Sequence, residues 1–275
     1  MDREPAPAKL NLALHVRRRR DDGYHELETL FAFVKHGDEV RLDGYGDGFA
    51  VEGPFAAGLA GEGDNLVTRA RDAFGAAFGV TTPGRITLQK NLPVASGLGG
   101  GSADAAAMLR LLARREGVPT DDPRLFAVAD GLGSDVPACL LGCTAIGTGR
   151  GERLAPIAGA PGVPVLLVNP GVAVATAAVF KRWDGVDRGA LPSGDALNAA
   201  RVGRNDLEAS ARALAPVVDA VLARLSDAPG VALARMSGSG ATCFALFDTV
   251  AARAAAARDI GEAEPGWWCL ETELA

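Results

Sequence analysis

A run of glycines near the middle of the chain has the composition of a phosphate-binding loop. The segment LPVASGLGGGSADAAAML places Gly97, Gly99, Gly100 and Gly101 directly before a helical pattern that begins at Ser102. Where side chains are absent, consecutive backbone N–H groups and the N-terminus of a helix can approach a phosphate group closely. We therefore predict that this loop binds the phosphates of a nucleotide.

Three kinds of glycine-containing turn fit this segment less well. A P-loop would carry a lysine directly after its glycines, and none follows here. A dinucleotide-binding turn would have a glycine where Ser102 stands, and an acidic residue at the end of a strand about 20 residues further on. An ordinary turn capped by Ser102 would need at most about two glycines.

The segment KLNLALHV at residues 9–16 has the alternating pattern of a β-strand. Its leucines and Val16 share one face, which we expect to pack in the core, while the other face offers Lys9 and Asn11 together. The four arginines at 17–20 come next, followed by Asp21, Asp22 and Gly23. We expect residues 17–23 to form a solvated turn, because adjacent cations repel each other unless they point into water.

Periodicity and turn residues predict the remaining elements. We expect strands at 39–42, 49–52, 85–89, 163–168, 231–236, 242–247 and 267–272. Glycine-rich turns between the first three of these strands favour antiparallel pairing. We expect helices after Asp64 or Asn65, from Ser102, at 125–132, at 206–225 with Asn205 as its cap and a break at Pro216, and at 250–260. This order of strands and helices predicts an α+β protein. The glycine and proline cluster at 147–164 predicts a boundary between two domains, residues 1–155 and 156–275.

The charge balance and the N-terminal sequence exclude several classes of protein. A formal net charge of -6 gives no electrostatic basis for binding nucleic acid or an anionic membrane. The initial MDREPAPAKL lacks the basic start and apolar run of a secretory signal, and no later stretch reaches about 18 uninterrupted apolar residues. We expect a cytoplasmic protein that acts on a small molecule, with neither nucleic acid nor membrane as a partner.

The cysteines and histidines lack the spacing of a metal site. Cys139, Cys143, Cys243 and Cys269 form no pair separated by two residues, and the three histidines are not spaced as their partners. We expect reduced and mostly buried thiols, and no metal ligand can be named.

Two glycine motifs together resemble those of the GHMP kinase superfamily, which includes galactose, homoserine, mevalonate and phosphomevalonate kinases. Residues 93–102 match its Pro-x-x-x-Gly-Leu-Gly-Gly-Gly-Ser loop, and SGSGAT at 237–242 matches its C-terminal motif. Further segments are similar to the members whose substrate carries cytidine: PAKLNLALHV, DGYHELETLF, LGSDVPACL at 132–140 and NDLE at 205–208. The resemblance implies a ribosomal protein S5 domain 2-like N-terminal domain, a ferredoxin-like α+β C-terminal domain, and a site in the cleft between them.

The same resemblance implies the activity. We expect ATP-dependent phosphorylation of the 2-hydroxyl of a methylerythritol linked to cytidine diphosphate, in the non-mevalonate route to isoprenoid precursors. Mg²⁺ is expected as the counter-ion of ATP, and the enzyme would be a monomer or a homodimer. The alternatives are a kinase of another small alcohol, such as homoserine or mevalonate, and a nucleotide-binding module without catalysis. The segment DGYHELETLF argues against the first, and the presence of Lys9 and Asp135 against the second.

The resemblance also assigns roles to residues of the site. Lys9 and Asp135 match the catalytic lysine and aspartate of the family. The positions that match substrate-binding residues are Asn11, Tyr24, His25, Phe31 and Phe180, of which the tyrosine and histidine would receive the cytosine. The positions that match ATP-binding residues are Asn65, Pro93, Val94, Ala95, Ser96, Gly97, Leu98, Gly99, Gly100, Gly101 and Ser102.

Without the resemblance, plainer roles would account for many of these residues. Lys9 would be a solvated strand residue and Asp135 a turn residue or helix cap before Pro137. Tyr24 and Phe31 would be core aromatics and His25 a surface residue that forms hydrogen bonds. Near the adenine, Asn65 would be a helix cap and Lys90 a solvated residue. These plainer roles explain the two residues as well as contact with the nucleotide does. One departure from the family is Ala103, where relatives often have a second serine.

Overall fold

The two longest strands lie at the N-terminal end of the chain. In the computed structural model, which describes residues 1–59 and 65–275, β1 (Asp2–Arg19) pairs with β2 (His25–Asp43). Both strands contribute to each of two compact units, which interleave along the chain. The first unit consists of 1–8, 36–94 and 99–142, and the second of 9–35, 95–98 and 143–275. The predicted domain limits at residues 155 and 156 stay a prediction.

The first unit contains part of a mixed sheet. Strands β3 (Phe49–Glu52) and β4 (Arg85–Gln89) have the predicted bounds, whereas the predicted strand at 39–42 is the end of the longer β2. Strand β4 is antiparallel to β2 but parallel to β3, so the prediction of antiparallel pairing was wrong for β3 and β4. The connection between these two strands contains a helix, and a crossover of that length lets the chain return in the same direction.

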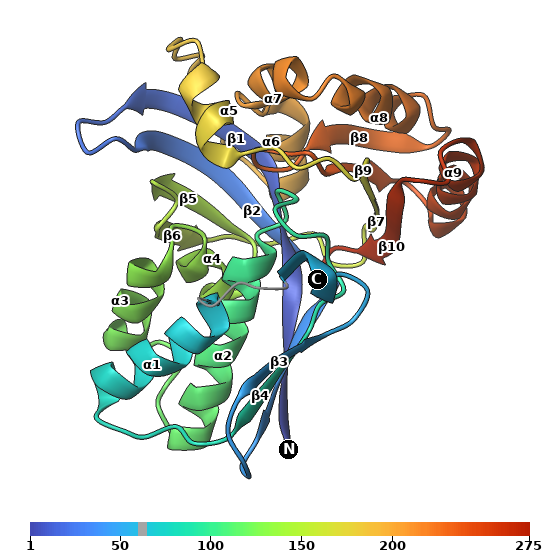
Figure 1. Cartoon of the computed structure of the whole chain (residues 1–275). Coiled ribbons are helices and arrows are strands. Elements are labelled where there is room, and N and C mark those ends of the chain that lie inside the picture. The colour runs from blue at the N-terminus through green and yellow to red at the C-terminus, as the bar shows by residue number, and fades with distance from the viewer. Residues whose placement is uncertain (60–64) are drawn as a thin grey trace. The chain divides into compact units, whose positions relative to one another are not determined.

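Four helices pack together in the first unit (Figure 1). They are α1 (Leu66–Phe78), α2 (Gly100–Glu116), α3 (Pro123–Leu132) and α4 (Val136–Leu141), preceded in the chain by the short 3-10 helix η1 (Ala56–Leu59). The side chain of Asn65 caps α1 by accepting a hydrogen bond of 2.9 Å from the Val67 N–H. Asp64, the alternative cap, lies outside the described residues.

Helix α2 begins two residues before the predicted start at Ser102. Its N-cap is Gly99, which has φ +63° in the left-handed region that glycine adopts without steric cost. The alternative of an ordinary turn capped by Ser102 does not hold, because the chain already turns into the helix at Gly99. The backbone N–H groups of the first turn of α2 have no acceptor within the helix, as at any helix N-terminus.

The second unit contains a four-stranded antiparallel sheet with the order β10, β7, β9, β8 (Figure 1). These strands are β7 (Pro164–Asn169), β8 (Val231–Met236), β9 (Cys243–Phe247) and β10 (Trp268–Glu273), each within one residue of its predicted limits. Helices α8 (Val217–Ser226) and α9 (Val250–Ala263) contact the sheet and share an apolar core with it. The predicted strand pair around SGSGAT is confirmed.

The second unit also contains two strands within the predicted boundary segment. Strand β5 (Ala145–Gly149) pairs with β2, and β6 (Arg153–Pro156) pairs with β5. The break at Pro216 is confirmed, because α7 (Glu208–Leu214) ends before it and α8 begins after it. Two further helices, α5 (Thr176–Arg182) and α6 (Ala196–Val202), were not predicted; each is too short for a clear helical period.

Strand β1 is buried on both faces over residues 8–16, so the prediction of a single core face was too narrow. The strand also continues to Arg19, so the predicted solvated turn is present at residues 21–23 but not at the arginines before them. Carboxylates stabilise this arginine-rich end, with Glu28 3.2 Å from Arg17 and Glu26 3.3 Å from Arg20. Pairing with acids removes the repulsion that the turn was expected to relieve.

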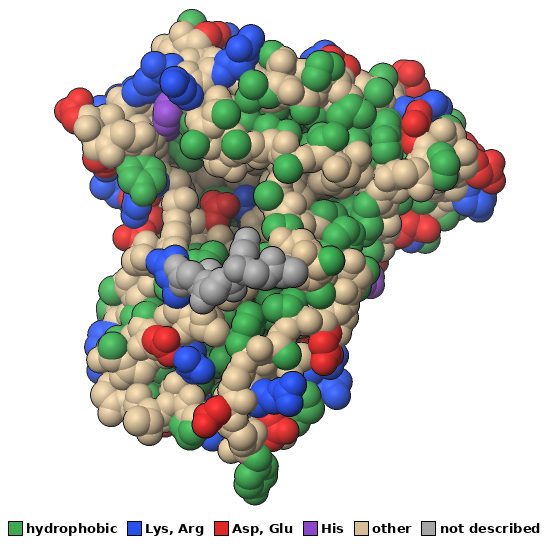
Figure 2. Space-filling view, in the orientation of Figure 1, with side chains coloured by type: hydrophobic (Ala, Val, Ile, Leu, Met, Phe, Trp, Pro, Cys, Tyr) green, Lys and Arg blue, Asp and Glu red, His purple; other side chains and the backbone are tan. Residues whose placement is uncertain are grey.

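Charged side chains of both signs are interspersed over the face of the molecule in Figure 2. None of the helices in the described ranges has the length and apolar character that crossing a membrane requires. All four cysteines are free; Cys139 and Cys243 are buried, but Cys143 is exposed, contrary to the expectation of mostly buried thiols.

Candidate active site

The two glycine motifs meet within the second unit. The Ser237 hydroxyl donates a hydrogen bond of 3.0 Å to the Gly97 carbonyl, and the Thr242 N–H donates one of 3.0 Å to the Ser96 carbonyl. Gly97 has φ +79°, and a Cβ atom there would lie 2.5 Å from the Ser237 carbonyl oxygen. Glycine is therefore required at Gly97 both by the backbone angle and by the close approach of the second motif.

The strand that carries Lys9 is joined to both motifs. The Lys9 N–H donates to the Leu98 carbonyl over 2.9 Å, and the Asn11 N–H donates to the Ser237 hydroxyl over 3.2 Å. The buried Ser237 hydroxyl thus accepts from β1 and donates to the glycine loop. One side chain holds together three segments that are far apart in the sequence.

The predicted residues Lys9, Asn11 and Phe31 lie together. The Lys9 ammonium donates a hydrogen bond of 2.8 Å to Asn11 Oδ1, and Asn11 Nδ2 donates one of 2.8 Å to the Thr29 hydroxyl. The ammonium also lies 5.6 Å from the centroid of the Phe31 ring, within the range of a cation–π interaction. All four side chains are buried, so Lys9 is not the solvated residue that its place in the strand alone suggested.

Asn205 does more than cap a helix. Its side-chain amide donates to the carbonyls of Met236 (2.9 Å) and Gly238 (2.8 Å), and its Oδ1 accepts from the Leu207 N–H (3.0 Å). The expectation of a simple cap was incomplete, because Leu207 is the N-cap of α7. Asn205 instead anchors the second glycine motif.

Asn169 Nδ2 donates a 2.8 Å hydrogen bond to the Thr242 hydroxyl, and it supports the same motif. Sequence reasoning missed Asn169, Thr29 and the linking role of Ser237. A polar residue at the end of the apolar run VPVLLVN was the available signal for Asn169.

The rings of Phe180 and Trp183 pack against His25, which directly follows Tyr24 in the sequence. The His25 ring lies 4.9 Å from the Phe180 ring and 5.7 Å, edge to face, from the Trp183 ring. Tyr24 is 51% exposed, which excludes the alternative of a core aromatic, and the Arg150 guanidinium lies 5.0 Å from its ring centroid. Sequence reasoning missed Trp183, although it is one of three tryptophans and follows the AAVFKR segment. Phe31 is fully buried, as the core alternative expected.

The polar groups beside these rings are incompletely satisfied. His25 Nε2 and Trp183 Nε1 are both buried, and within the described residues neither has a hydrogen-bond partner. Burial, and secondarily the positive charge of Arg19, lower the pKa of His25 below its ordinary 6.5. The imidazole is therefore neutral at neutral pH, with one nitrogen that donates and one that accepts.

Of the remaining predicted residues, Ala95 belongs to the second unit, and Asp135, Asn65, Pro93, Val94 and residues 99–102 belong to the first. Asp135 is half-buried and precedes α4, but among the described residues its side chain makes no capping hydrogen bond, so its position alone does not make it a cap. Asn65 does cap α1, in agreement with its plainer role. Because Asp135 and Lys9 belong to different units, their pairing stays a prediction.

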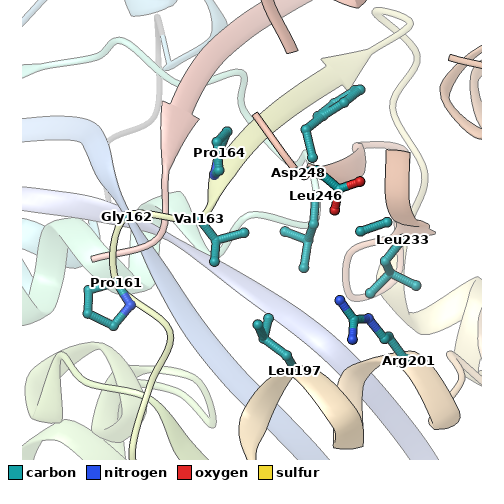
Figure 3. A pocket seen from close by; sticks show the side chains of 11 residues that line it. Pro161, Gly162, Val163, Pro164, Leu197, Arg201, Leu233, Leu246 and Asp248 are labelled. Atoms are coloured by element: carbon teal, nitrogen blue, oxygen red, sulfur yellow. The ribbon is translucent and has the colours of Figure 1, made fainter. Parts of the chain in front are cut away.

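A pocket of about 380 Å³ lies elsewhere in the second unit (Figure 3). It is lined by the 161–164 segment, by Leu197 and Arg201 of α6, and by residues of β8 and β9. Apolar side chains such as Leu233 and Leu246 point into it. It contains none of the predicted site residues.

Known proteins share both the motifs and the fold. The family models of the GHMP kinases N terminal domain and the GHMP kinases C terminal match residues 65–143 and 188–264. A 4-diphosphocytidyl-2-C-methyl-D-erythritol kinase of Rhizorhabdus wittichii is 55% identical to the chain, over 98% of this chain and 94% of its own length. The chain belongs to this family of GHMP kinases. Another member, from Novosphingobium aromaticivorans, is 52% identical over 98% of this chain and 91% of its own.

Solved structures agree with this family assignment. The crystal structure of a 4-(cytidine 5'-diphospho)-2C-methyl-D-erythritol kinase is similar with a TM-score of 0.81 and 37% identity, covering 100% of this chain and 99% of that one. A homoserine kinase from Cytophaga hutchinsonii has a TM-score of 0.73 over 98% of this chain and 93% of its own, but at 19% identity it shows the fold alone. The predicted superfamily and the mixed α and β fold with GHMP N-terminal and C-terminal domains are thus confirmed.

Proposed function

We propose that this family member transfers the γ-phosphoryl group of ATP to the 2-hydroxyl of 4-diphosphocytidyl-2-C-methyl-D-erythritol, giving the 2-phosphate and ADP. Relatives that bear this kinase name match nearly the whole chain. The observation that carries the proposal is the set of hydrogen bonds through Ser237, which holds the Lys9 strand against the glycine loop. The reaction belongs to the non-mevalonate route to isoprenoid precursors.

Phosphoryl transfer depends mainly on positioning and on neutralising charge. We assign phosphate binding to the backbone N–H groups at the start of α2, a helix of 17 residues whose N-terminus carries partial positive charge. The Lys9 ammonium, oriented by Asn11, would stabilise charge on the transferred group. Asp135 would accept the proton of the attacking hydroxyl.

Mg²⁺ would supply further charge neutralisation as the counter-ion of ATP. Such an ion is commonly held by phosphate oxygens, water and one or two carboxylates rather than by a cage of protein ligands. No cluster of three or more His, Cys, Asp or Glu side chains suited to a metal occurs among the described residues. We therefore assign no residue as its ligand.

The aromatic residues around His25 are suited to a pyrimidine. The exposed ring of Tyr24 offers a stacking surface, and the neutral imidazole of His25 can both donate to and accept from the edge of cytosine. Phe180 packs against His25 and fixes its orientation. Phe31, buried beneath Lys9, would position the ammonium rather than stack on the base.

The test is ADP release by the purified enzyme with a panel of alcohols. ATP should be consumed only with the cytidine-linked methylerythritol, because only that substrate carries the cytosine that we assign to Tyr24 and His25. Equal turnover with homoserine or mevalonate would contradict the proposal.

We place the enzyme in the cytoplasm, together with its two proposed nucleotide substrates. We expect it to be a monomer or a homodimer.

A further inference from the structure

A buried ionic cluster lies in the first unit, outside the contacts assigned above. Lys90, which directly follows β4, forms ion pairs with Asp38 of β2 and, over 2.9 Å, with Asp104 of α2. The three side chains are at most 3% exposed. The interpretation of Lys90 as a solvated residue was therefore wrong, and the sequence gives no sign of its partners.

The cluster contacts the residues on both sides of the glycine loop. Asp38 Oδ1 accepts hydrogen bonds from the N–H groups of Asn91 (2.5 Å) and Leu92 (2.8 Å), which directly precede the loop. Gly100, at the other end of the glycine loop, also lies close to the cluster. A Cβ atom added to Gly100 would be 3.0 Å from the Lys90 ammonium and 3.5 Å from Asp38 Oδ2. Asp104 lies one turn further along the same helix. The first turn of α2 thus rests directly on the cluster.

The charges of the cluster balance only if one carboxyl group keeps its proton. Burial is the main cause that raises the pKa of Asp104 to about 8; Asp38 raises it further, while Lys90 opposes the rise. Burial also lowers the pKa of Lys90, but the charges of Asp104 and Asp38 outweigh it and hold this pKa above its ordinary value. Asp104 therefore keeps its proton to a higher pH than an exposed aspartate does, and this proton brings the net charge of the cluster toward zero.

We propose that Lys90, Asp38 and Asp104 are positioning residues for ATP. Their side chains hold the segments on both sides of the glycine loop, and together they place no net charge beneath the first turn of α2. The proposal rests on the phosphate-binding role assigned to this loop. Loss of the Asp104 proton would leave a net negative charge beneath the helix N-terminus, where the phosphates bind, and a buried uncompensated charge is costly. Lys90 and Asp38 are the charged groups that face Asp104.

The decisive variant is Asp104→Asn, which keeps the shape of the neutral acid at every pH. Its Kd for ATP is measured by calorimetry with Mg²⁺ across the range from pH 7 to pH 9 and compared with that of the wild type. Between pH 7 and pH 9 the wild-type Kd should rise, whereas that of Asp104→Asn should stay constant. Equal pH profiles for the two proteins would overturn the proposal.

Lys90→Met tests the positioning role separately. Removing the cation should weaken ATP binding about 10-fold or more, since small displacements of positioning groups can cost up to about 100-fold. The KM for the cytidine substrate should be unchanged, and Lys35→Met, which alters an exposed lysine, is the control. A lower melting temperature with unchanged ATP affinity would reduce Lys90 to a structural residue. If Lys90→Met does not fold, the pH profile of ATP binding by Asp104→Asn tests the proposal alone.

The ATP-binding measurements need no alcohol substrate. Failure of the proposed function would appear as absence of ADP release by the wild type with the cytidine substrate. Failure of the present inference would appear, in an active enzyme, as equal pH profiles of ATP binding for Asp104→Asn and the wild type and as unchanged ATP binding in Lys90→Met.

Discussion

The two parts of the proposed site within the second unit differ in how well their polar groups are satisfied. Around Ser237, the hydroxyl, amide and carbonyl groups of β1 and of both glycine motifs pair with one another. Around His25 the contacts are between rings, and two buried nitrogens have no partner among the described residues. Satisfied buried networks fix a single geometry, whereas each unsatisfied buried group costs about 1–3 kcal/mol.

The two halves of the site are therefore prepared to different degrees. The part that we assign to phosphoryl transfer is organised by the protein itself, before any ligand binds. The part that we assign to cytosine retains hydrogen-bonding capacity that a base can use. Substitutions in the first part should therefore affect turnover and ATP binding, and substitutions in the second should affect only substrate affinity.

The largest effect is expected from the catalytic pair. Lys9→Met and Asp135→Asn should each lower kcat about 100-fold or more, the usual scale for losing a positioned acid–base or charge-stabilising group. We propose that the two act together, so the double variant should be little worse than either single variant in steady-state kinetics. Strict additivity would separate their roles, and near-normal turnover of Asp135→Asn would make it a structural residue.

Gly97→Ala should act on ATP binding. Its Cβ would lie 2.5 Å from the Ser237 carbonyl and 2.9 Å from that of Gly240, so the two motifs must separate. Overpacking of about 1–3 kcal/mol corresponds to roughly a 5- to 150-fold weaker Kd. Gly185→Ala is the matched control, because Gly185 has φ +81° and open space around it among the described residues. If both variants bind ATP equally well, the close contact does not organise the loop.

Tyr24→Ala should act on the other half of the site alone. Losing a stacking surface worth about 1–3 kcal/mol should raise the Kd for the cytidine substrate roughly 5- to 150-fold. Tyr24→Phe keeps the ring and should be nearly silent. Tyr45→Ala, at a tyrosine that is 88% exposed, is the control for loss of a surface aromatic. A fall in ATP affinity in Tyr24→Ala would contradict the separation of the two halves.

The smallest effect concerns pH. Because the pKa of His25 is lowered from 6.5, the imidazole is neutral above that pH, and the KM for the cytidine substrate should be constant there. As the pH falls below 6.5, protonation replaces the accepting nitrogen by a donor, and this KM should rise. The folded state binds fewer protons than the unfolded state in that range, so its stability should fall in the same direction. His25→Gln should show a flatter KM profile.

Local signals made much of this site predictable from the sequence. The alternation in residues 9–16 identified the strand of Lys9 and Asn11, and the glycines of the loop directly indicate a close backbone approach. Strand limits at 49–52 and 85–89 were recovered because turn residues flank them. These features depend on neighbours in the sequence.

Features that depend on distant partners were not predictable. The parallel pairing of β3 with β4 is decided by the connection between them, and the hub at Ser237 joins residues 226 and 140 positions away. Lys90 resembles any polar residue at the end of a strand until Asp38, 52 positions away, is placed beside it. The contact of Trp183, which follows α5, with the distant His25 could not be predicted from the sequence neighbours of Trp183.

Hydrogen–deuterium exchange of the free enzyme and of its complex with the cytidine substrate tests the difference between the two halves without any substitution. The amides of Lys9, Asn11, Ser237, Gly240 and Thr242 should exchange slowly before any ligand is added, because their hydrogen bonds join buried segments. Residues 20–25 form an exposed turn with local hydrogen bonds only, so their amides should exchange faster in the free enzyme and slow down when the substrate binds. Rapid exchange of the first set of amides in the free enzyme, with no change at 20–25 on binding, would contradict a preorganised transfer site beside an adaptable cytosine site.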